Sequence, residues 1–223
     1  EVVGEQHGTR FYPSISGVAR SLNYYPIGDE KAEEGTVSLA LGLGKYIVDG
    51  GLTLRVCPYH PTQVLQTSEM EIALRETQTS FYALDLRNKG ENFSLDDGFN
   101  LLKLPVKEAE KDGALQYIAS TYDPYDMVIR DGIYPGGRKV ITFANILQHE
   151  VFPLSRILQL AQEYGQREMR RPVEIEFAVT LNQKEKTGTF YLLQVRPMVD
   201  VKADLSEDLN LIPEENVLLK SFN

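Results

Sequence analysis

Four polar side chains near the C-terminal end stand in two apolar runs and have the chemistry of a metal and phosphate site. Glu174 and Glu176 lie two residues apart in "VEIEFAV", and Gln194 and Arg196 lie two residues apart in "YLLQVRP". A carboxylate and an amide supply the hard oxygen ligands that Mg²⁺ prefers when phosphates complete its octahedron. An arginine offers paired donors to a phosphoryl oxygen. Phosphoryl transfer needs little beyond such positioning and charge neutralisation, so these residue types make it a candidate chemistry.

The two runs predict an antiparallel hairpin, which fixes how the four side chains lie relative to one another. If the hairpin is symmetric about Glu185, Glu176 lies opposite Gln194 and Glu174 lies opposite Arg196. Side chains alternate between the two faces of a strand, so all four share one face. The apolar residues between them are expected on the opposite face, packed against the preceding helix: Ile175, Phe177, Leu193 and Val195.

The alternative is a plain solvent-exposed face. In that case Glu174 and Arg196 form a cross-strand ion pair, which contributes under ~1 kcal/mol when it is exposed. Gln194 favours the ligand site, because an amide oxygen opposite Glu176 adds a second metal ligand. Both interpretations stay open from these residues alone.

The composition is that of an ordinary globular protein. The chain has 223 residues, of which 42% are hydrophobic and 25% charged, enough for a sizeable core in one or two domains. Its net charge of −9 argues against a nucleic-acid partner. No apolar run approaches the ~20 residues that cross a bilayer, and the first residues show no secretory signal, so no membrane partner is expected.

The cysteine and histidine content predicts neither a disulfide nor a histidine metal centre. Cys57 is the single cysteine, which excludes an internal disulfide and fits a reducing cytoplasm, where we expect the protein to be. In "LRVCPYHP" the thiol is expected to be buried as a small apolar group. The three histidines have no metal-ligand spacing among them, so surface or capping roles are expected for His7, His60 and His149.

Coarse patterns indicate an α+β chain with a distinct middle region. Residues 1–3 are predicted to form a short strand, and "TVSLALGLGKYIVDGG" predicts two short elements around a Gly-rich turn. Residues 59–143 contain strand-like runs such as "SFYALDL" and "FNLLKLPV". In the same region "MVIRDGIYPGGRKVITFA" predicts two strands around a turn, so we expect a β-rich insertion there.

The longest helical pattern directly precedes the hairpin. Pro153 suits its first turn and Gly165 lies near its end. The acidic tail at 201–223 is predicted to be a linker toward a further domain. Apolar residues recur along the helix at helical spacing, at Leu154, Ile157, Leu158, Leu160 and Ala161.

The hairpin and two upstream segments together resemble the ATP-binding domain of phosphoenolpyruvate synthase and pyruvate phosphate dikinase. "EIEFAV … FYLLQVRP" is similar to the acidic strand and the "LQxRP"-type strand that end that domain. "YPSISGVARSLNYYP" resembles the family's "SGV" segment, and "LALGLGKYIVDGG" resembles its "GLGE-x-V-x-G" segment. The order and rough spacing of all three agree. The resemblance covers about residues 1–58 and 144–200.

The resemblance implies an ATP-grasp fold over residues 1–200, with an antiparallel sheet, packed helices and the β-rich insertion inside it. It implies ATP and Mg²⁺ as ligands, and phosphoryl transfer to a His on a separate domain and then to pyruvate. Residues 1–3 would belong to the strand that lines the adenine. Carried over by position, the ATP-binding residues are Glu174, Glu176, Gln194 and Arg196, with Glu176 and Gln194 as metal ligands and Arg196 as the catalytic residue at the γ-phosphate.

One residue departs from the family pattern, because Lys45 stands where the family has an acid after "GLG". The other half of the ATP cleft would lie before residue 1, and the His and pyruvate domains elsewhere in the parent chain. This chain alone is therefore expected to be inactive and to bind ATP weakly. Two alternatives follow: a non-catalytic nucleotide-sensing or structural module, and a dikinase that acts on another acceptor.

Overall fold

The chain folds into interleaved helices and antiparallel sheets. The computed structural model describes residues 2–87, 98–182, 185 and 187–198. In this part of the chain every paired strand runs antiparallel to its neighbour, which confirms the predicted α+β class. None of the described helices has the length and apolar character needed to cross a bilayer. The predicted linker at 201–223 lies outside the described residues.

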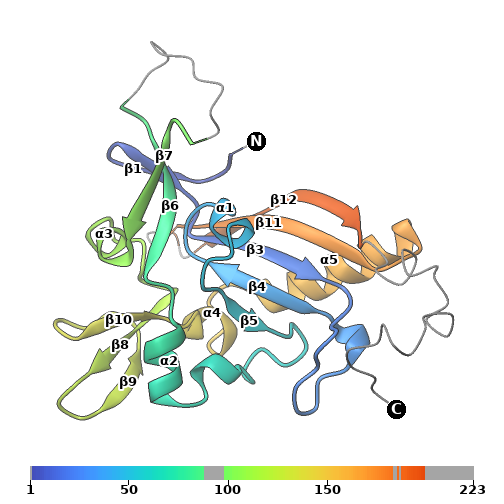
Figure 1. Ribbon diagram of the computed structural model, residues 1–223, viewed down its shortest axis with the longest axis horizontal. Helices are drawn as coiled ribbons and strands as arrows, with labels where there is room; N and C mark the ends of the chain where they lie inside the picture. Colours follow the sequence, from blue (N-terminus) through green and yellow to red (C-terminus); the bar gives the residue numbers. More distant parts are fainter. Residues whose placement is uncertain (1, 88–97, 183–184, 186, 199–223) are drawn as a thin grey trace, which may run out of the picture.

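The largest sheet has five strands in the order β12-β11-β3-β4-β5 and carries the polar hairpin (Figure 1). Strand β11 is hydrogen-bonded to β12 on one side and to β3 on the other, so it lies inside the sheet. The strands are β3 (Ile15–Arg20), β4 (Thr36–Ala40), β5 (Leu54–Val56), β11 (Val173–Asn182) and β12 (Thr187–Pro197).

Two smaller sheets contain the N-terminal hairpin and the middle region. The four-stranded sheet, in the order β1-β2-β6-β7, consists of β1 (Glu5–His7), β2 (Arg10–Tyr12), β6 (Ser80–Asp85) and β7 (Leu101–Pro105). The three-stranded sheet, in the order β10-β8-β9, consists of β8 (Ala119–Asp123), β9 (Val128–Asp131) and β10 (Arg138–Ile141).

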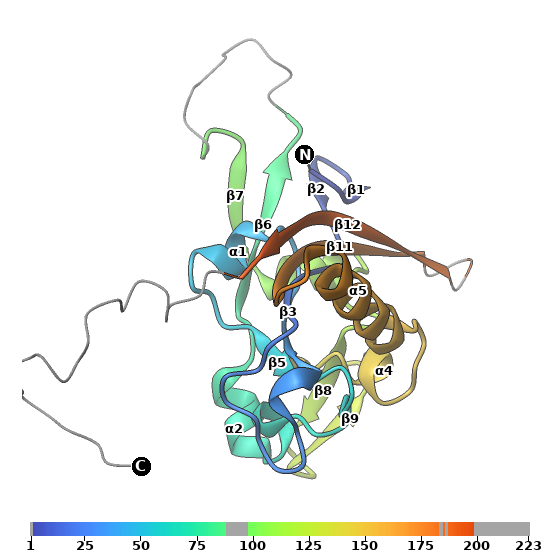
Figure 2. The same ribbon diagram turned by 90° about the vertical axis from the view of Figure 1, so that its right-hand side faces the viewer.

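The helices are short apart from the one before the hairpin. They are α1 (Lys45–Val48), α2 (Met70–Glu76), α3 (Val106–Lys111), α4 (Ala144–Leu147) and α5 (Leu154–Met169), with 3₁₀ turns η1 (Ala32–Glu34) and η2 (Leu65–Thr67). Figure 1 and Figure 2 show α5 on one side of the five-stranded sheet and α1 on the other. The two faces of this sheet therefore have different neighbours.

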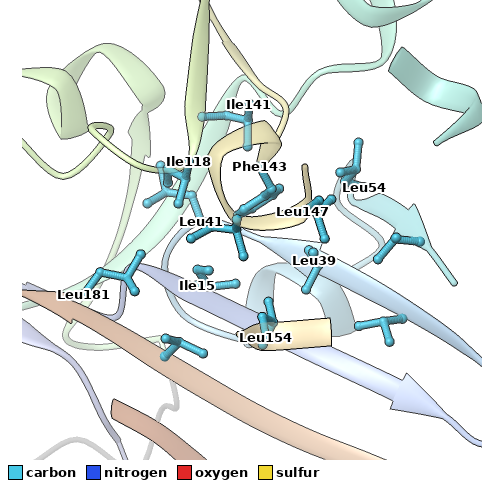
Figure 3. Close-up of a cluster of buried hydrophobic side chains, with 14 of the residues drawn as sticks. Ile15, Leu39, Leu41, Leu54, Ile118, Ile141, Phe143, Leu147, Leu154 and Leu181 are labelled. Atoms are coloured by element: carbon cyan, nitrogen blue, oxygen red, sulfur yellow. The ribbon is translucent and has the colours of Figure 1, made fainter. Parts of the chain in front are cut away.

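The predicted long helix is confirmed and closes the core. Pro153 caps α5, and its missing N–H costs nothing because the first turn of a helix has no acceptor for that group. Leu154 and Leu158 of α5 are buried beneath the sheet. The side chains of this core come from all three sheets and from α3, α4 and α5, and Figure 3 shows part of the cluster. One continuous cluster thus joins parts of the chain that are far apart in sequence.

Two expectations about strands are wrong in detail. Val2 and Val3 lie outside any strand, and the first strand begins at Glu5, so the predicted strand at 1–3 is not formed by its described residues. The strands predicted around Pro135 exist as β9 and β10, but they do not pair with each other. Both pair with β8, whose strand pattern the sequence analysis did not single out.

The middle region forms the three-stranded sheet by itself, but its strands β6 and β7 share a sheet with the N-terminal hairpin. Strand β6 pairs with β2 from the N-terminal hairpin, through Arg10 opposite Asp85 and Phe11 opposite Leu84. Arg10 also bonds Glu108 of α3 at 2.7 Å and, at 3.2 Å, Asp112, which follows α3. Although 59–143 is rich in strands as predicted, it is built into the same fold as the segments around it.

Gly17 of the "SGV" segment is required by packing. It pairs with Phe177 across the β3–β11 ladder, and a Cβ there would lie 2.1 Å from Cζ of the Phe177 ring. We expect Gly17→Ala to lower the free energy of unfolding by about 1–3 kcal/mol through overpacking, measured by urea denaturation.

The matched control is Gly44→Ala, whose added Cβ would meet its nearest neighbour, Ser16 Cβ, at 3.8 Å. This change is expected to stay within about 0.5 kcal/mol of the parent. Equal effects of the two substitutions would contradict the steric explanation for Gly17.

Candidate functional site

The predicted register of the hairpin is confirmed. Glu174 pairs with Arg196 and Glu176 pairs with Gln194 across β11 and β12, which brings the four predicted residues onto one face of the sheet. On the other side of β11, Glu174 pairs with Arg20 of β3. We call these five residues the polar face. It lies opposite the face that packs on α5, where Val173, Ile175 and Val195 surround Gly165.

A β-bulge separates the polar face from the end of the hairpin. The register shifts between Glu176 and Phe177, because Phe177 pairs with Leu192 and leaves Leu193 as the extra residue. The expectation that Leu193 packs against the helix is therefore wrong, and its side chain is 42% exposed. A bulge re-aims neighbouring side chains, and this one lies directly beside Gln194.

Glu174 is the centre of the polar face. Its carboxylate accepts a hydrogen bond from Arg20 Nε at 2.7 Å and from Arg196 Nε at 2.8 Å, with a further bond from Arg196 Nη2. The Glu174 side chain is 11% exposed, whereas those of Arg20 and Arg196 are 50% and 55% exposed. One nearly buried carboxylate thus holds two half-exposed guanidinium groups side by side.

These contacts change the acid–base behaviour of the pair. Burial opposes ionisation of Glu174, but the hydrogen bonds from Arg196 and Arg20 outweigh it and lower the pKa of the carboxyl. The hydrogen bond to Glu174 in turn raises the pKa of Arg196. Glu174 is therefore ionised at neutral pH. Its negative charge is compensated by Arg20 and Arg196, which both donate to its carboxylate.

Glu176 and Gln194 are the two residues of the polar face that could hold a metal, as the sequence predicted for them. The Glu176 side chain is 34% exposed, and Arg196 Nη2 lies 3.9 Å from its Oε1, too far for a hydrogen bond. Gln194 is exposed at the paired position. A carboxylate and an amide that both reach solvent can supply two oxygen ligands to Mg²⁺, leaving the remaining positions for phosphate and water.

The "GLG" turn lies over the same side of the sheet and is anchored from three directions. Ser16 Oγ donates to the Gly42 carbonyl at 2.6 Å, and the Leu43 amide donates to the Tyr82 carbonyl at 2.9 Å. Gln78 holds the backbone of Leu41 through both ends of its side-chain amide, at 2.8 and 3.0 Å. Gly42 has a φ of 86°, and a Cβ there would lie 2.6 Å from the Tyr82 carbonyl oxygen, so glycine is needed.

Lys45 begins α1 directly after this turn. Lys45 Nζ donates a hydrogen bond to Asp49 Oδ1 at 3.2 Å, one helical turn along. This hydrogen bond is the largest of the contributions that lower the pKa of the Asp49 carboxyl. The residue that replaces the family's acid therefore has its own local partner on the helix surface.

Two contributors to the site were missed by the sequence analysis. Alternation in "SISGVAR" indicates only that Arg20 shares a face with Ser16, whereas its place in the site depends on the pairing of β3 with β11. Gln78 gave no local signal, since its role depends on a contact with Leu41 across 37 residues.

Comparison with known protein families gives a match over most of the chain. A family model described as "Pyruvate phosphate dikinase, AMP/ATP-binding domain" matches residues 1–212.

The chain belongs to this family. The match to the pyruvate phosphate dikinase AMP/ATP-binding domain includes the middle region 59–143, in which the residues themselves gave no resemblance. The contacts of Gln78 and Tyr82 with the "GLG" turn give that region a structural reason to belong to the domain. No curated protein matches the chain.

The two arginine contacts make the stability of this pyruvate phosphate dikinase-type domain depend on Glu174. The carboxyl has a lowered pKa in the fold, against about 4.3 in an unfolded chain. Its stabilisation is therefore present above about pH 4.3 and is lost as the pH falls through the lower folded value. We expect Glu174→Gln to cost about 1–2 kcal/mol at pH 7. The difference from the parent should shrink steadily in acid, followed by urea denaturation across pH.

Glu176→Gln is the matched control, because its carboxylate is more exposed and makes only the long contact with Arg196. Its stability should follow that of the parent at every pH. If the free energy of unfolding of Glu174→Gln changed with pH as that of the parent does, the contacts of Glu174 with the two arginines would contribute nothing to folding.

Proposed function

We propose that the polar face binds the phosphate chain of Mg-ATP in a phosphoenolpyruvate synthase or pyruvate phosphate dikinase-like phosphotransferase. The observation that supports this most is the pair of arginines held by Glu174, next to Glu176 and Gln194, whose side chains reach solvent. Membership of an AMP/ATP-binding domain family supports the nucleotide as the ligand.

Each residue of the polar face has a separate role in this proposal. Arg196 contacts the γ-phosphate and is the catalytic residue, while Arg20 offers a second cation from β3. Glu176 and Gln194 hold the Mg²⁺, which neutralises charge on the phosphates. Glu174 acts as a positioning residue, since the arginines occupy its carboxylate.

The charges of the polar face balance, which makes ATP binding depend on the metal ligands. Arg20 and Arg196 carry two positive charges, and Glu174 and Glu176 carry two negative ones. A face without net charge attracts a polyanion such as ATP only weakly. When Glu176 is neutralised by a divalent cation, the arginines give the face the sign that attracts phosphate.

The transfer itself would continue outside this chain. As in the family that the sequence resembles, the γ-phosphoryl group would pass to a His on another domain and then to pyruvate. A dikinase that serves another acceptor uses the same ATP site. A cytoplasmic setting suits both, because the single cysteine, Cys57, is a free thiol, as is usual in a reducing compartment.

A second candidate is a non-catalytic nucleotide-sensing module, which one observation favours. Lys45 stands at the family's acidic position and is paired with Asp49, so that position contributes no metal ligand. If Lys45→Glu strengthens the Mg²⁺ dependence of ATP binding, the position faces the nucleotide and the present lysine weakens the metal site. If the Mg²⁺ dependence of ATP binding is the same in Lys45→Glu as in the parent, Lys45 is no argument against the catalytic proposal.

The proposal predicts that Mg-ATP stabilises a protein containing this chain and the other half of its ATP cleft. At about 100 times Kd the ligand adds about 2.7 kcal/mol to the free energy of unfolding, seen as a rise in melting temperature. Arg196→Gln and Gln194→Ala should each reduce that rise. This chain alone is expected to bind weakly, and calorimetry that shows micromolar affinity would contradict that expectation.

Arg138→Gln on β10 serves as the control, because it removes an exposed arginine from a different sheet. It should leave the ATP-induced rise unchanged. The assigned site would be wrong if Gln194→Ala and Arg196→Gln bound Mg-ATP as well as the parent.

A further inference from the structure

Three side chains with metal-binding atoms meet at one end of the β4–β5 pair. Glu34 Oε2 lies 3.0 Å from His60 Nε2 and 4.0 Å from Cys57 Sγ. All three ligand atoms lie within 4.8 Å of one another. The five-stranded sheet explains how they meet, because Val37 pairs with Val56. The residues just before β4 and just after β5 are thereby brought together.

Local structure fixes each of the three groups. Residues 57–60 form a turn closed by the His60 amide and the Cys57 carbonyl at 3.0 Å. Helix α5 supports this turn, since Gln159 Nε2 donates to the Pro58 carbonyl at 2.9 Å. Glu34 ends η1, and its carboxylate accepts the Lys31 amide at 2.8 Å. The ligand atoms are therefore presented by ordered backbone on two segments.

We propose that Cys57, His60 and Glu34 bind a divalent cation of the Zn²⁺ class, with water as the fourth ligand. Zinc bonds of about 2.3 Å to sulfur and about 2.0 Å to nitrogen and oxygen place tetrahedral ligands roughly 3.3–3.7 Å apart. The separations of 3.0 and 4.0 Å lie on either side of that range, so small side-chain movements suffice. The site is separate in residues and chemistry from the oxygen-only Mg²⁺ ligands of the polar face.

The set of donor atoms selects the metal. Thiolate and imidazole favour Zn²⁺ over Mg²⁺ and Ca²⁺, which take oxygen ligands. The side chains of His60 and Glu34 are 23% and 16% exposed, which leaves a path for the ion and for a water ligand. Cys57 is fully buried and supplies the inner wall of the site.

The protonation states of the free site are compatible with this role. The Lys31 amide, with His60 acting in the same direction, lowers the pKa of Glu34, so the carboxylate is ready to coordinate. Burial raises the pKa of the Cys57 thiol, while the amides of Tyr59 and His60 oppose that rise. Coordination replaces the thiol proton by the metal, and the proton leaves to solvent.

A second histidine–carboxylate pair in the chain shows what the thiol adds. His149 Nε2 lies 3.1 Å from Asp131 Oδ2, nearly the distance found in the His60–Glu34 pair. Among the described residues, however, the His149 pair belongs to no group of three metal-binding side chains. It is therefore a matched control: the same hydrogen bond without the sulfur.

The experiment is a Co²⁺ titration of the reduced chain, followed by visible and ultraviolet absorption. Tetrahedral Co²⁺ shows visible d–d bands, and a bound thiolate adds a sulfur-to-cobalt charge-transfer band. We expect one Co²⁺ per chain, both signals, and their loss when Zn²⁺ is added. Cys57→Ser should abolish the charge-transfer band, and His60→Gln and Glu34→Gln should each weaken binding at least about tenfold. His149→Gln should bind as the parent does.

Glu34→Gln keeps the size of the side chain and leaves the thiol in place, so it tests the site even if Cys57→Ser disturbs the core. Circular dichroism verifies that each variant is folded. The proposal is overturned if the parent gives no charge-transfer band with Co²⁺, or if the band survives in Cys57→Ser. It is equally overturned if His149→Gln weakens binding as much as His60→Gln.

Discussion

Strand β11 is hydrogen-bonded on both sides, and this constraint orders the rest of the site. With β3 and β12 as fixed neighbours, each side chain of β11 can point to only one of two faces. Ile175 and Phe177 are buried on one face, which commits Glu174 and Glu176 to the other. A slip of one residue would place both carboxylates under α5, at a large desolvation cost. The apolar core therefore sets the position of the polar groups.

The middle region shows how distant parts of the chain serve the same face. Strand β6 holds the "GLG" turn through the Tyr82 carbonyl, and Gln78, just before β6, clamps the backbone of Leu41. The turn lies beside Ser16, four residues before Arg20 on the same side of β3. Any shift of β6 would move the turn relative to the polar face. Residues 59–143, in which the sequence showed no resemblance to the family, thus help to position the "GLG" turn.

The sequence predicted what depends on local periodicity and missed what depends on long-range pairing. The register of Glu174 with Arg196 follows from alternation and a near-symmetric loop, so it could be derived. The bulge at Leu193 could not, because one extra residue in a strand leaves the apolar pattern almost unchanged. The contact of Arg20 with Glu174 spans 154 residues, and no local pattern states which strand lies next to which. The same reason hid the meeting of Glu34 with Cys57 and His60.

The two arginines have more donors than Glu174 can use, and this decides what the carboxylate does. A guanidinium carries five N–H donors, and the bonds to Glu174 engage Nε of Arg20 and Nε and Nη2 of Arg196. The remaining N–H groups belong to side chains that are half exposed. They can face a phosphate oxygen while the bonds to Glu174 persist. Because the side chains are already ordered, less rotamer entropy is lost when an anion binds. In the proposed function, Glu174 would therefore prepare the arginines for phosphate and would not compete with it.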